Sequence, residues 1–190
     1  MAQNTTMQAS DWLTYSHLTN SPRNRAAVRD FTVAHPETGG GLERYLKEDA
    51  LQDEVNSLMR TYLVWHRFTG ECVGYFSLKA GLVAVNEQIM PDNSKAFDTV
   101  PGVELANFAI DEQFQQKYQL FGLGKILFRR LIVPFVLKLS KSLGIYLIYV
   151  SRHADCPLFA TFFWRGQCSW RDGRGPHVFF QIPKNALIFH

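Results

Sequence analysis

The sequence has few cysteines, and its first residues lack the apolar stretch of a secretion signal. Both observations bear on the compartment in which we expect the protein. Cysteine occurs three times in 190 residues, at Cys72, Cys156 and Cys168. So small and odd a number argues against a disulfide framework and is typical of reduced thiols in a cytoplasm. Residues 1–7 are polar and lack the apolar stretch of a secretion signal, so we expect a cytoplasmic protein.

Long apolar runs free of charge are also missing. The most apolar window, residues 126–139, includes Arg129, Arg130, Pro134 and Lys138, and therefore does not predict a membrane span. The formal net charge is only +3. That value suits an acidic ligand or RNA, but it is too small to require nucleic acid as the partner.

No metal site is expected, because the four thiol and imidazole side chains near the C-terminus are badly spaced. His153, Cys156, Cys168 and His177 form none of the compact pairs that tetrahedral zinc sites use. Hydrophobic residues make up 46% of the chain and charged residues 19%, which is a globular composition. We expect a single domain over residues 1–190.

The most informative stretch joins an apolar strand to a glycine-bearing turn and a helix. Residues 103–111 are largely apolar on both faces, as expected of a central strand. The turn that follows has the pattern Gln-x-x-Gly-x-Gly, formed by Gln119, Gly122 and Gly124, with Lys125 just inside the next helix. Backbone N–H groups converge at such a helix N-terminus, and glycine lets a phosphate approach the main chain. The sequence therefore predicts an anion site.

This pattern resembles the pyrophosphate-binding loop of the GNAT acetyltransferase superfamily. It lacks the Lys-Ser/Thr end of a P-loop and the third glycine of a dinucleotide-binding turn. The resemblance implies that the loop holds the diphosphate of acetyl-CoA, the acyl donor, and that the preceding strand pairs with the pantetheine arm. The residues implied to bind the cofactor are Phe108, Ala109, Ile110, Gln119, Leu120, Phe121, Gly122, Leu123, Gly124 and Lys125.

Three further segments resemble the GNAT branch that contains the acetyltransferase toxins of bacterial toxin–antitoxin modules. They are Leu42 to Ala50, Thr61 to Val64 and Val73 to Leu78, and the resemblance covers roughly residues 30–150. It implies an α/β fold with a mixed, mostly antiparallel sheet, a splayed parallel strand pair and flanking helices. The parallel pair would be residues 103–111 and 145–150, joined by a right-handed crossover.

Other elements follow from periodicity and from turn-forming residues. Residues 61–66 and 72–80 predict a hairpin, and residues 42–59 predict a helix. We expect Gly39–Gly41 to form a flexible hinge before that helix and residues 86–102 to form a loop. A second helix is expected over about 121–142, kinked or split at Pro134.

The two ends of the chain are less regular. Residues 1–27 are expected to be irregular, with Ser21-Pro22 as a breaker, although residues 12–18 could dock on the body as a short helix or strand. Residues 151–190 diverge from the family pattern, and only 177–182 predicts a strand. Aligned on Gly166, Phe162 takes the place of the tyrosine that donates a proton to the departing thiolate in many family members.

Glu104 is the candidate general base, because it is an ionisable residue near the start of the central strand. Partial burial can raise the pKa of a glutamate toward neutrality. A surface glutamate at the strand edge is the competing interpretation. Asp111, at the other end of the strand, is expected to cap the following turn.

Three functions remain open at this point. The first is an acetyl-CoA-dependent N-acetyltransferase acting on a primary amine. The second is a toxin-type enzyme that acetylates aminoacyl-tRNA and binds an antitoxin protein. The third is a coenzyme A-binding module with little catalytic activity, which the divergent C-terminus favours. The sequence names neither the amine nor the oligomeric state, leaves a homodimer open, and gives no reason to expect a membrane partner.

Overall fold

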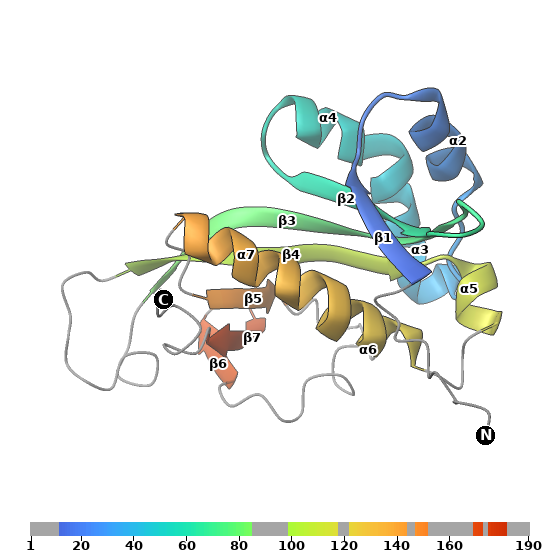
Figure 1. Cartoon of the computed structure of the whole chain (residues 1–190). Coiled ribbons are helices and arrows are strands. Elements are labelled where there is room, and N and C mark those ends of the chain that lie inside the picture. The colour runs from blue at the N-terminus through green and yellow to red at the C-terminus, as the bar shows by residue number, and fades with distance from the viewer. Residues whose placement is uncertain are drawn as a thin grey trace, which may run out of the picture. The chain divides into compact units, whose positions relative to one another are not determined.

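The computed structural model describes residues 12–84, 99–117, 122–143, 147–151, 169–172 and 175–181 (Figure 1). The strands are β1 (Leu13–His17), β2 (Arg60–His66), β3 (Cys72–Ala84), β4 (Thr99–Ile110), β5 (Leu147–Ser151), β6 (Ser169–Asp172) and β7 (Gly175–Gln181). The helices are α2 (Pro22–Asp30), α3 (Pro36–Arg44), α4 (Ala50–Val55), α5 (Glu112–Lys117), α6 (Leu123–Leu127) and α7 (Val133–Leu143), with π-helical segments η1 (Tyr45–Asp49) and η3 (Phe128–Ile132).

The strands form a mixed sheet in the order β1-β2-β3-β4-β5-β7-β6. The chain divides into two compact units, and β3 and β4 contribute to both. The first unit contains residues 1–77 and 107–133, and the second contains residues 78–106 and 134–190. Within the described ranges, no helix is both long and apolar enough to cross a membrane.

In the first unit, the N-terminal segment forms an edge strand followed by a helix. β1 pairs with β2 in the antiparallel direction, with Leu13 opposite His66, so Leu13–His17 docks as a strand, which is one of the two alternatives expected for residues 12–18. The expectation that Ser21-Pro22 acts as a breaker is wrong. The Ser21 hydroxyl accepts a hydrogen bond from the Asn24 N–H at 3.2 Å, and Pro22 occupies the first turn of α2. Serine as N-cap and proline just inside are strong helix-start signals.

The expected helix over 42–59 begins earlier and ends earlier. Helical structure runs from Pro36 to Val55, so the glycine run is part of α3 and not a hinge. A Cβ on Gly39 would lie 3.2 Å from a methyl carbon of Val33, which explains the small residue there. The apolar stripe is also only half buried, since Leu46 is buried whereas Val55 is 73% exposed. The intervening π turn η1 changes the phase of the side chains, which a constant 3.6-residue period cannot predict.

The core of the first unit lies between these helices and one face of the sheet. It is built from buried residues of β2, β3 and β4, of the helical segment 36–55, and of the connections that follow β1 and α2: Leu18, Phe31, Val33, Leu46, Ala50, Leu63, Trp65, Tyr75 and Ala109. Tyr75 is fully buried, and its hydroxyl donates a 2.6 Å hydrogen bond to the Leu42 carbonyl. Trp65 of β2 and Tyr75 of β3 are the aromatic strand residues of this core.

Glu54 of α4 ties that helix to β1 and β2. Its carboxylate, 6% exposed, binds Nε2 of His17 at 2.8 Å and Nη1 of Arg60 at 2.9 Å, and accepts a hydrogen bond from the Thr61 N–H. We expect Glu54→Ala to lower the free energy of unfolding by about 1–3 kcal/mol, because the buried Thr61 N–H loses its acceptor. The loss should be smaller than for a fully buried ion pair, since His17 and Arg60 are 45% and 47% exposed.

Urea unfolding of the two proteins measures this difference. Glu48→Ala is the matched control, because Glu48 is exposed on the same helical segment and should change stability little. Equal unfolding midpoints for Glu54→Ala and wild type would show that the network does not hold α4 to the sheet.

In the first unit, β3 and β4 approach each other closely at Gly74. A Cβ on Gly74 would lie 2.5 Å from the Ala109 carbonyl oxygen, so no larger residue fits there. The Asp111 N–H donates to the Val73 carbonyl at 2.9 Å. β2 and β3 are neighbours in the sheet and are joined by a short turn, as the predicted hairpin requires.

In the second unit, β4 and β5 are parallel, as predicted. Gly102, Val103 and Glu104 lie opposite Leu147, Ile148 and Tyr149. This pairing stops at Glu104, although both strands continue beyond it, so the two strands separate where the fold class requires a splay. β4 begins at Thr99, which corrects the prediction of a loop up to residue 102. Pro101 precedes the first pair with β5, so its missing N–H costs no bond on that side.

The C-terminal part of the second unit adds two strands. β7 pairs with β5 in the antiparallel direction, and β6 pairs with β7. The sequence predicts a strand only over 177–182 in this part of the chain, so β6 and the start of β7 at Gly175 are corrections. These strands are defined by their pairing with each other, in which Asp172 lies opposite Gly175. The residues on either side of so short a connection look turn-like by themselves.

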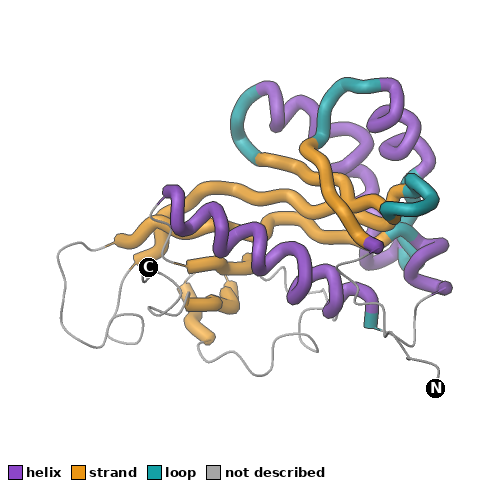
Figure 2. The backbone as a smooth tube through the Cα atoms, in the orientation of Figure 1, coloured by secondary structure: helices purple, strands orange, loops and turns teal. Residues whose placement is uncertain are grey.

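The predicted crossover helix is present, but it is not split at Pro134. Helical structure is unbroken over residues 123–143 (Figure 2). The irregularity lies just before the proline, as the π segment η3. The Val133 N–H donates to the Phe128 carbonyl, five residues back. Proline cannot donate to the carbonyl four residues before it, and a π turn at that point keeps the helix continuous.

Candidate functional site

The predicted anion site is a left-handed turn at the start of α6. Gly122 has φ 58° and ψ 50°, a conformation that glycine adopts without steric cost. Its carbonyl accepts from the N–H groups of Lys125 at 2.9 Å and Ile126 at 3.2 Å, which fixes the first helical turn. The N–H groups of Leu123 and Gly124 lie in that same turn, where a helix offers no intrahelical acceptor. This geometry suits a phosphate.

Burial around the turn is uneven in a way that favours a ligand on its outer side. Leu123 and Gly124 are buried, whereas Gly122 and Lys125 are exposed. A Cβ on Gly122 would meet no atom within 4 Å. The other three predicted loop residues, Gln119, Leu120 and Phe121, lie outside the described residues, so their part in the site stays a prediction.

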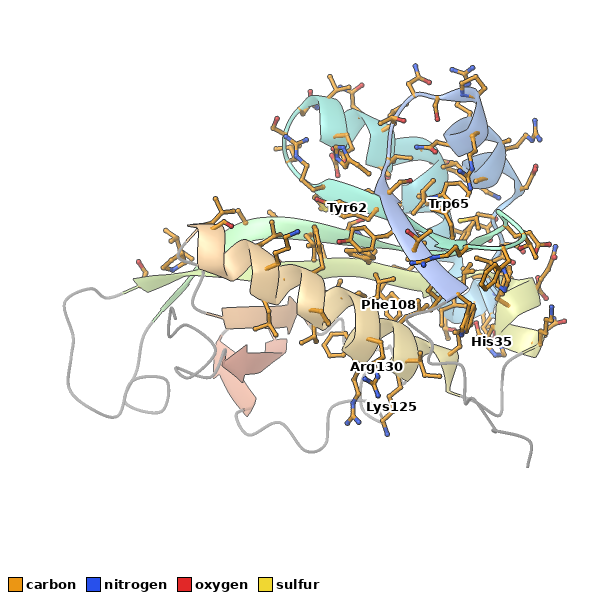
Figure 3. The ribbon with its side chains drawn as sticks, in the orientation of Figure 1. His35, Tyr62, Trp65, Phe108, Lys125 and Arg130 are labelled. Carbon is orange, nitrogen blue, oxygen red and sulfur yellow. The ribbon has the colours of Figure 1, made fainter. Side chains whose placement is uncertain are left out.

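The strand predicted to pair with the pantetheine arm supplies two accessible side chains and one buried one. Phe108 and Ile110 are partly exposed, whereas Ala109 is 7% exposed and belongs to the core beneath the helices. Phe108 and Lys125 are labelled in Figure 3 and belong to the same compact unit. The side chain of Ala109 belongs to the core, which leaves Phe108 and Ile110 as the accessible side chains of this stretch.

Glu104 is partly buried and is the last residue of β4 that pairs with β5. It belongs to the second compact unit, whereas the cofactor residues belong to the first. Glu104 therefore lies where the pairing of β4 with β5 ends. Its role as a base stays a prediction.

Asp111 caps the next helix, as predicted. Its carboxylate accepts hydrogen bonds from the N–H groups of Gln113 at 3.0 Å and Thr32 at 3.3 Å. Burial raises the pKa of this carboxyl, and the two N–H groups partly offset that effect. The residue holds α5 and the 31–35 connection to the end of β4, which makes it structural.

A polar cluster on the helix-covered face of the sheet was not predicted from the sequence. Tyr45, Met59, Thr61, Ser77 and Asn107 form it, and all belong to the first unit. The Thr61 and Ser77 hydroxyls lie 2.9 Å apart, and the Tyr45 hydroxyl lies 3.4 Å from the Met59 sulfur. Asn107 donates to the same sulfur at 3.8 Å. A thioether is a weak acceptor, so the cluster retains hydrogen-bonding capacity. The only signal in the sequence is a polar residue among apolar ones in β4.

Metal and thiol chemistry find no support in the described part of the chain. Within it, no three His, Cys, Asp or Glu side chains could hold a metal ion together. Of the residues considered for zinc, His153, Cys156 and Cys168 lie outside the described ranges. Burial raises the pKa of the Cys72 thiol to about 12, so its nucleophilic thiolate is scarce at neutral pH.

The sequence matches no protein-family model and no curated protein. Solved structures give clear matches. A point mutant of KacT superimposes with a TM-score of 0.68 at 20% identity, covering 92% of this chain and 97% of that one. AtaT complexed with acetyl-methionyl-tRNAfMet gives 0.67 at 19% identity, covering 92% and 98%. AtaTR bound with AcCoA gives 0.63 at 18% identity, covering 93% and 96%.

These neighbours are GNAT-fold acetyltransferase toxins of toxin–antitoxin modules. The structural likeness extends beyond residues 30–150, which carry the sequence resemblance, because it covers 92% of the chain. At such low identity it establishes the fold and not the reaction. The chain has the GNAT fold.

Proposed function

We propose that this protein is an acetyl-CoA-dependent N-acetyltransferase that transfers the acetyl group to a primary amine. One observation carries the proposal: the left-handed Gly122 turn opens the crossover helix that leads from β4 to β5. That turn offers free backbone N–H groups to a diphosphate. The separation of β4 from β5 after Glu104 supports it, since the freed edge of β4 can pair with an amide-bearing arm.

The residues of this chain then have distinct tasks. The N–H groups of Leu123 and Gly124 hold the diphosphate, and the backbone of residues 108–110 orients the pantetheine arm. Glu104 accepts a proton from the amine, which attacks the thioester carbonyl as the bond from carbon to sulfur breaks. The departing thiolate needs a proton, and Phe162 has no hydroxyl to supply it. Water or another residue must do so, which predicts slow turnover.

Aminoacyl-tRNA is the acceptor that we propose to test first. AtaT, one of the structural neighbours, has been solved in complex with acetyl-methionyl-tRNAfMet. The net charge of +3 on this chain suits an RNA-borne amine. A second neighbour structure contains AtaT bound to the C-terminus of the antitoxin AtaR, so an antitoxin-like protein is a proposed partner.

Transfer of radiolabelled acetyl from acetyl-CoA tests the proposal. We expect label on an amine panel or on charged tRNA, and none on uncharged tRNA, because only the aminoacyl group carries a reactive primary amine. Charged tRNA as the sole labelled acceptor would select the toxin-type enzyme. Binding of acetyl-CoA without transfer to any acceptor would select the coenzyme A-binding module, and absence of binding would overturn both.

A further inference from the structure

The polar cluster on the helix-covered face of the sheet lies beside the stretch of β4 that is proposed to hold the pantetheine arm. Its member on β4 is Asn107, which comes immediately before Phe108. Side chains alternate between the two faces of a strand, so Asn107 projects on the same face as Ala109, whose side chain belongs to the core. The cluster and residues 108–110 are in the same compact unit.

Asn107 makes only a weak hydrogen bond at this position. Its Nδ2 donates to the Met59 sulfur at 3.8 Å, and a thioether is a poor acceptor. Among the described residues, no group donates to the Oδ1 of Asn107. The Asn107 side chain is partly exposed, and Met59 is unbranched and changes rotamer readily. The amide therefore retains both a donor and an acceptor for a bound molecule.

The Tyr45 hydroxyl of η1 reaches the same sulfur and is held in place from a second direction. It lies 3.4 Å from the Sδ of Met59 and 3.5 Å from the Oγ1 of Thr61. The Tyr45 ring stacks on the ring of Tyr75, with the two centroids 6.4 Å apart. Tyr45 and Asn107 thus present two fixed polar groups to the small space around one sulfur atom.

A carboxylate lies close to this hydroxyl. Burial raises the pKa of Tyr45, hydrogen bonds with the Thr61 and Ser77 hydroxyls oppose the rise, and the nearby Asp53 of α4 adds to it. The Tyr45 hydroxyl is therefore neutral at physiological pH. Asp53 is partly exposed, and none of the ion pairs formed within the described ranges includes it. A carboxylate beside neutral polar groups attracts an ammonium ion.

The direction of attack on a thioester makes this face of the sheet relevant to the acceptor. A nucleophile adds to a carbonyl carbon from above or below the plane of the carbonyl group. An arm that pairs with the freed edge of β4 would hold its thioester near the plane of the sheet. The amine must then arrive over one face, next to residues 108–110. On the helix-covered face, the polar side chain at that place is Asn107.

We propose that Asn107 and Tyr45 bind the acceptor amine and orient it toward the thioester, and that Asp53 attracts the ammonium form in which it arrives. The inference rests on the proposed function, because it needs the acyl donor on β4. The substrate class that fits is a primary amine with a carbonyl oxygen close to its nitrogen. The oxygen accepts from Nδ2 of Asn107, and the nitrogen bonds the Tyr45 hydroxyl. Both bonds replace weak contacts with the Met59 thioether.

Steady-state acetyl transfer tests the subsite, with the acceptor that takes up most label from the amine panel and charged tRNA. Asn107→Ala and Tyr45→Phe should each raise KM for the acceptor about ten-fold, because each removes one hydrogen bond to it. KM for acetyl-CoA should not change. Asn107→Leu repeats the first comparison without leaving a cavity. Asp53→Asn should raise the acceptor KM at low ionic strength and much less at high ionic strength, because salt screens the attraction.

Tyr75→Phe is the matched control. It removes a hydroxyl on the same face of the sheet, one that donates to the Leu42 carbonyl, and keeps the ring on which Tyr45 stacks. We expect this variant to lose stability in thermal unfolding and to retain the wild-type KM for the acceptor.

The outcomes separate this subsite from the proposed function. If wild type transfers acetyl and the folded Asn107 and Tyr45 variants keep its KM for the acceptor, the subsite is wrong and the proposed function stands. If KM for acetyl-CoA rises together with KM for the acceptor, or if Tyr75→Phe has the same effect, the cluster only supports the fold and the subsite is again wrong. If wild type labels no acceptor, the proposed function fails and the inference fails with it.

Discussion

Replacing Gly124 with aspartate is expected to abolish binding of acetyl-CoA. Gly124 is buried in the first turn of α6, beside the N–H groups assigned to the diphosphate. A carboxylate there would lie close to a phosphate charge, and two like charges 4 Å apart repel by about 4 kcal/mol at a protein surface. That energy corresponds to a loss of affinity of about a thousand-fold, which calorimetry can measure.

Two control variants separate the charge effect from misfolding. Gly41→Asp makes the same substitution in α3, where a Cβ meets no atom within 4 Å, and should leave affinity unchanged. Gly124→Ala adds a Cβ without charge and should weaken binding less than aspartate does. Thermal unfolding of each variant shows whether it is folded. Unchanged affinity in a folded Gly124→Asp protein would mean that the turn only begins a helix.

Replacing Glu104 with glutamine is expected to lower turnover by about 10²–10⁴-fold, the usual loss when a positioned base is removed. Affinity for coenzyme A should stay nearly the same, because Glu104 is not among the residues proposed to hold the diphosphate. Steady-state acetyl transfer measures the first quantity and calorimetry the second. A structural role for Glu104 would lower both stability and turnover, whereas a catalytic role lowers turnover alone.

A matched control separates the loss of this carboxylate from the loss of any glutamate. Glu48→Gln, at an exposed helical position, is the matched control and should behave as wild type. Full activity of Glu104→Gln would rule out Glu104 as the base.

The sequence predicts the centre of the fold well, because local and long-range signals agree there. The apolar strand, the glycine turn and the helix after it leave few arrangements, and a right-handed crossover then requires β4 and β5 to be parallel. The left-handed conformation of Gly122 also follows from the sequence, since glycine is the residue that adopts it readily.

Elsewhere tertiary contacts override the local signals. Gly39–Gly41 is weakly helical by itself, yet it lies in α3, where Gly39 packs on Val33. β6 is defined by its pairing with β7, which no local pattern of four residues reveals. Ser21-Pro22 differs from these, because serine followed by proline is itself a helix-start signal, although proline also marks breaks.

The candidate site was predictable only in part for the same reasons. The phosphate-binding turn is a local pattern, and so it is readable from the sequence. The polar cluster around Met59 depends on strand pairing, which no local pattern reveals.

An NMR titration with acetyl-CoA tests the central claim most directly. Backbone amide resonances of ¹⁵N-labelled protein report where the diphosphate binds, since a phosphate that accepts a hydrogen bond shifts the donating N–H. We predict that the amides of Gly122, Leu123, Gly124 and Lys125 shift most at saturation. A saturating titration that leaves these four amides in place, while others move, would contradict the assignment of the Gly122 turn as the cofactor site.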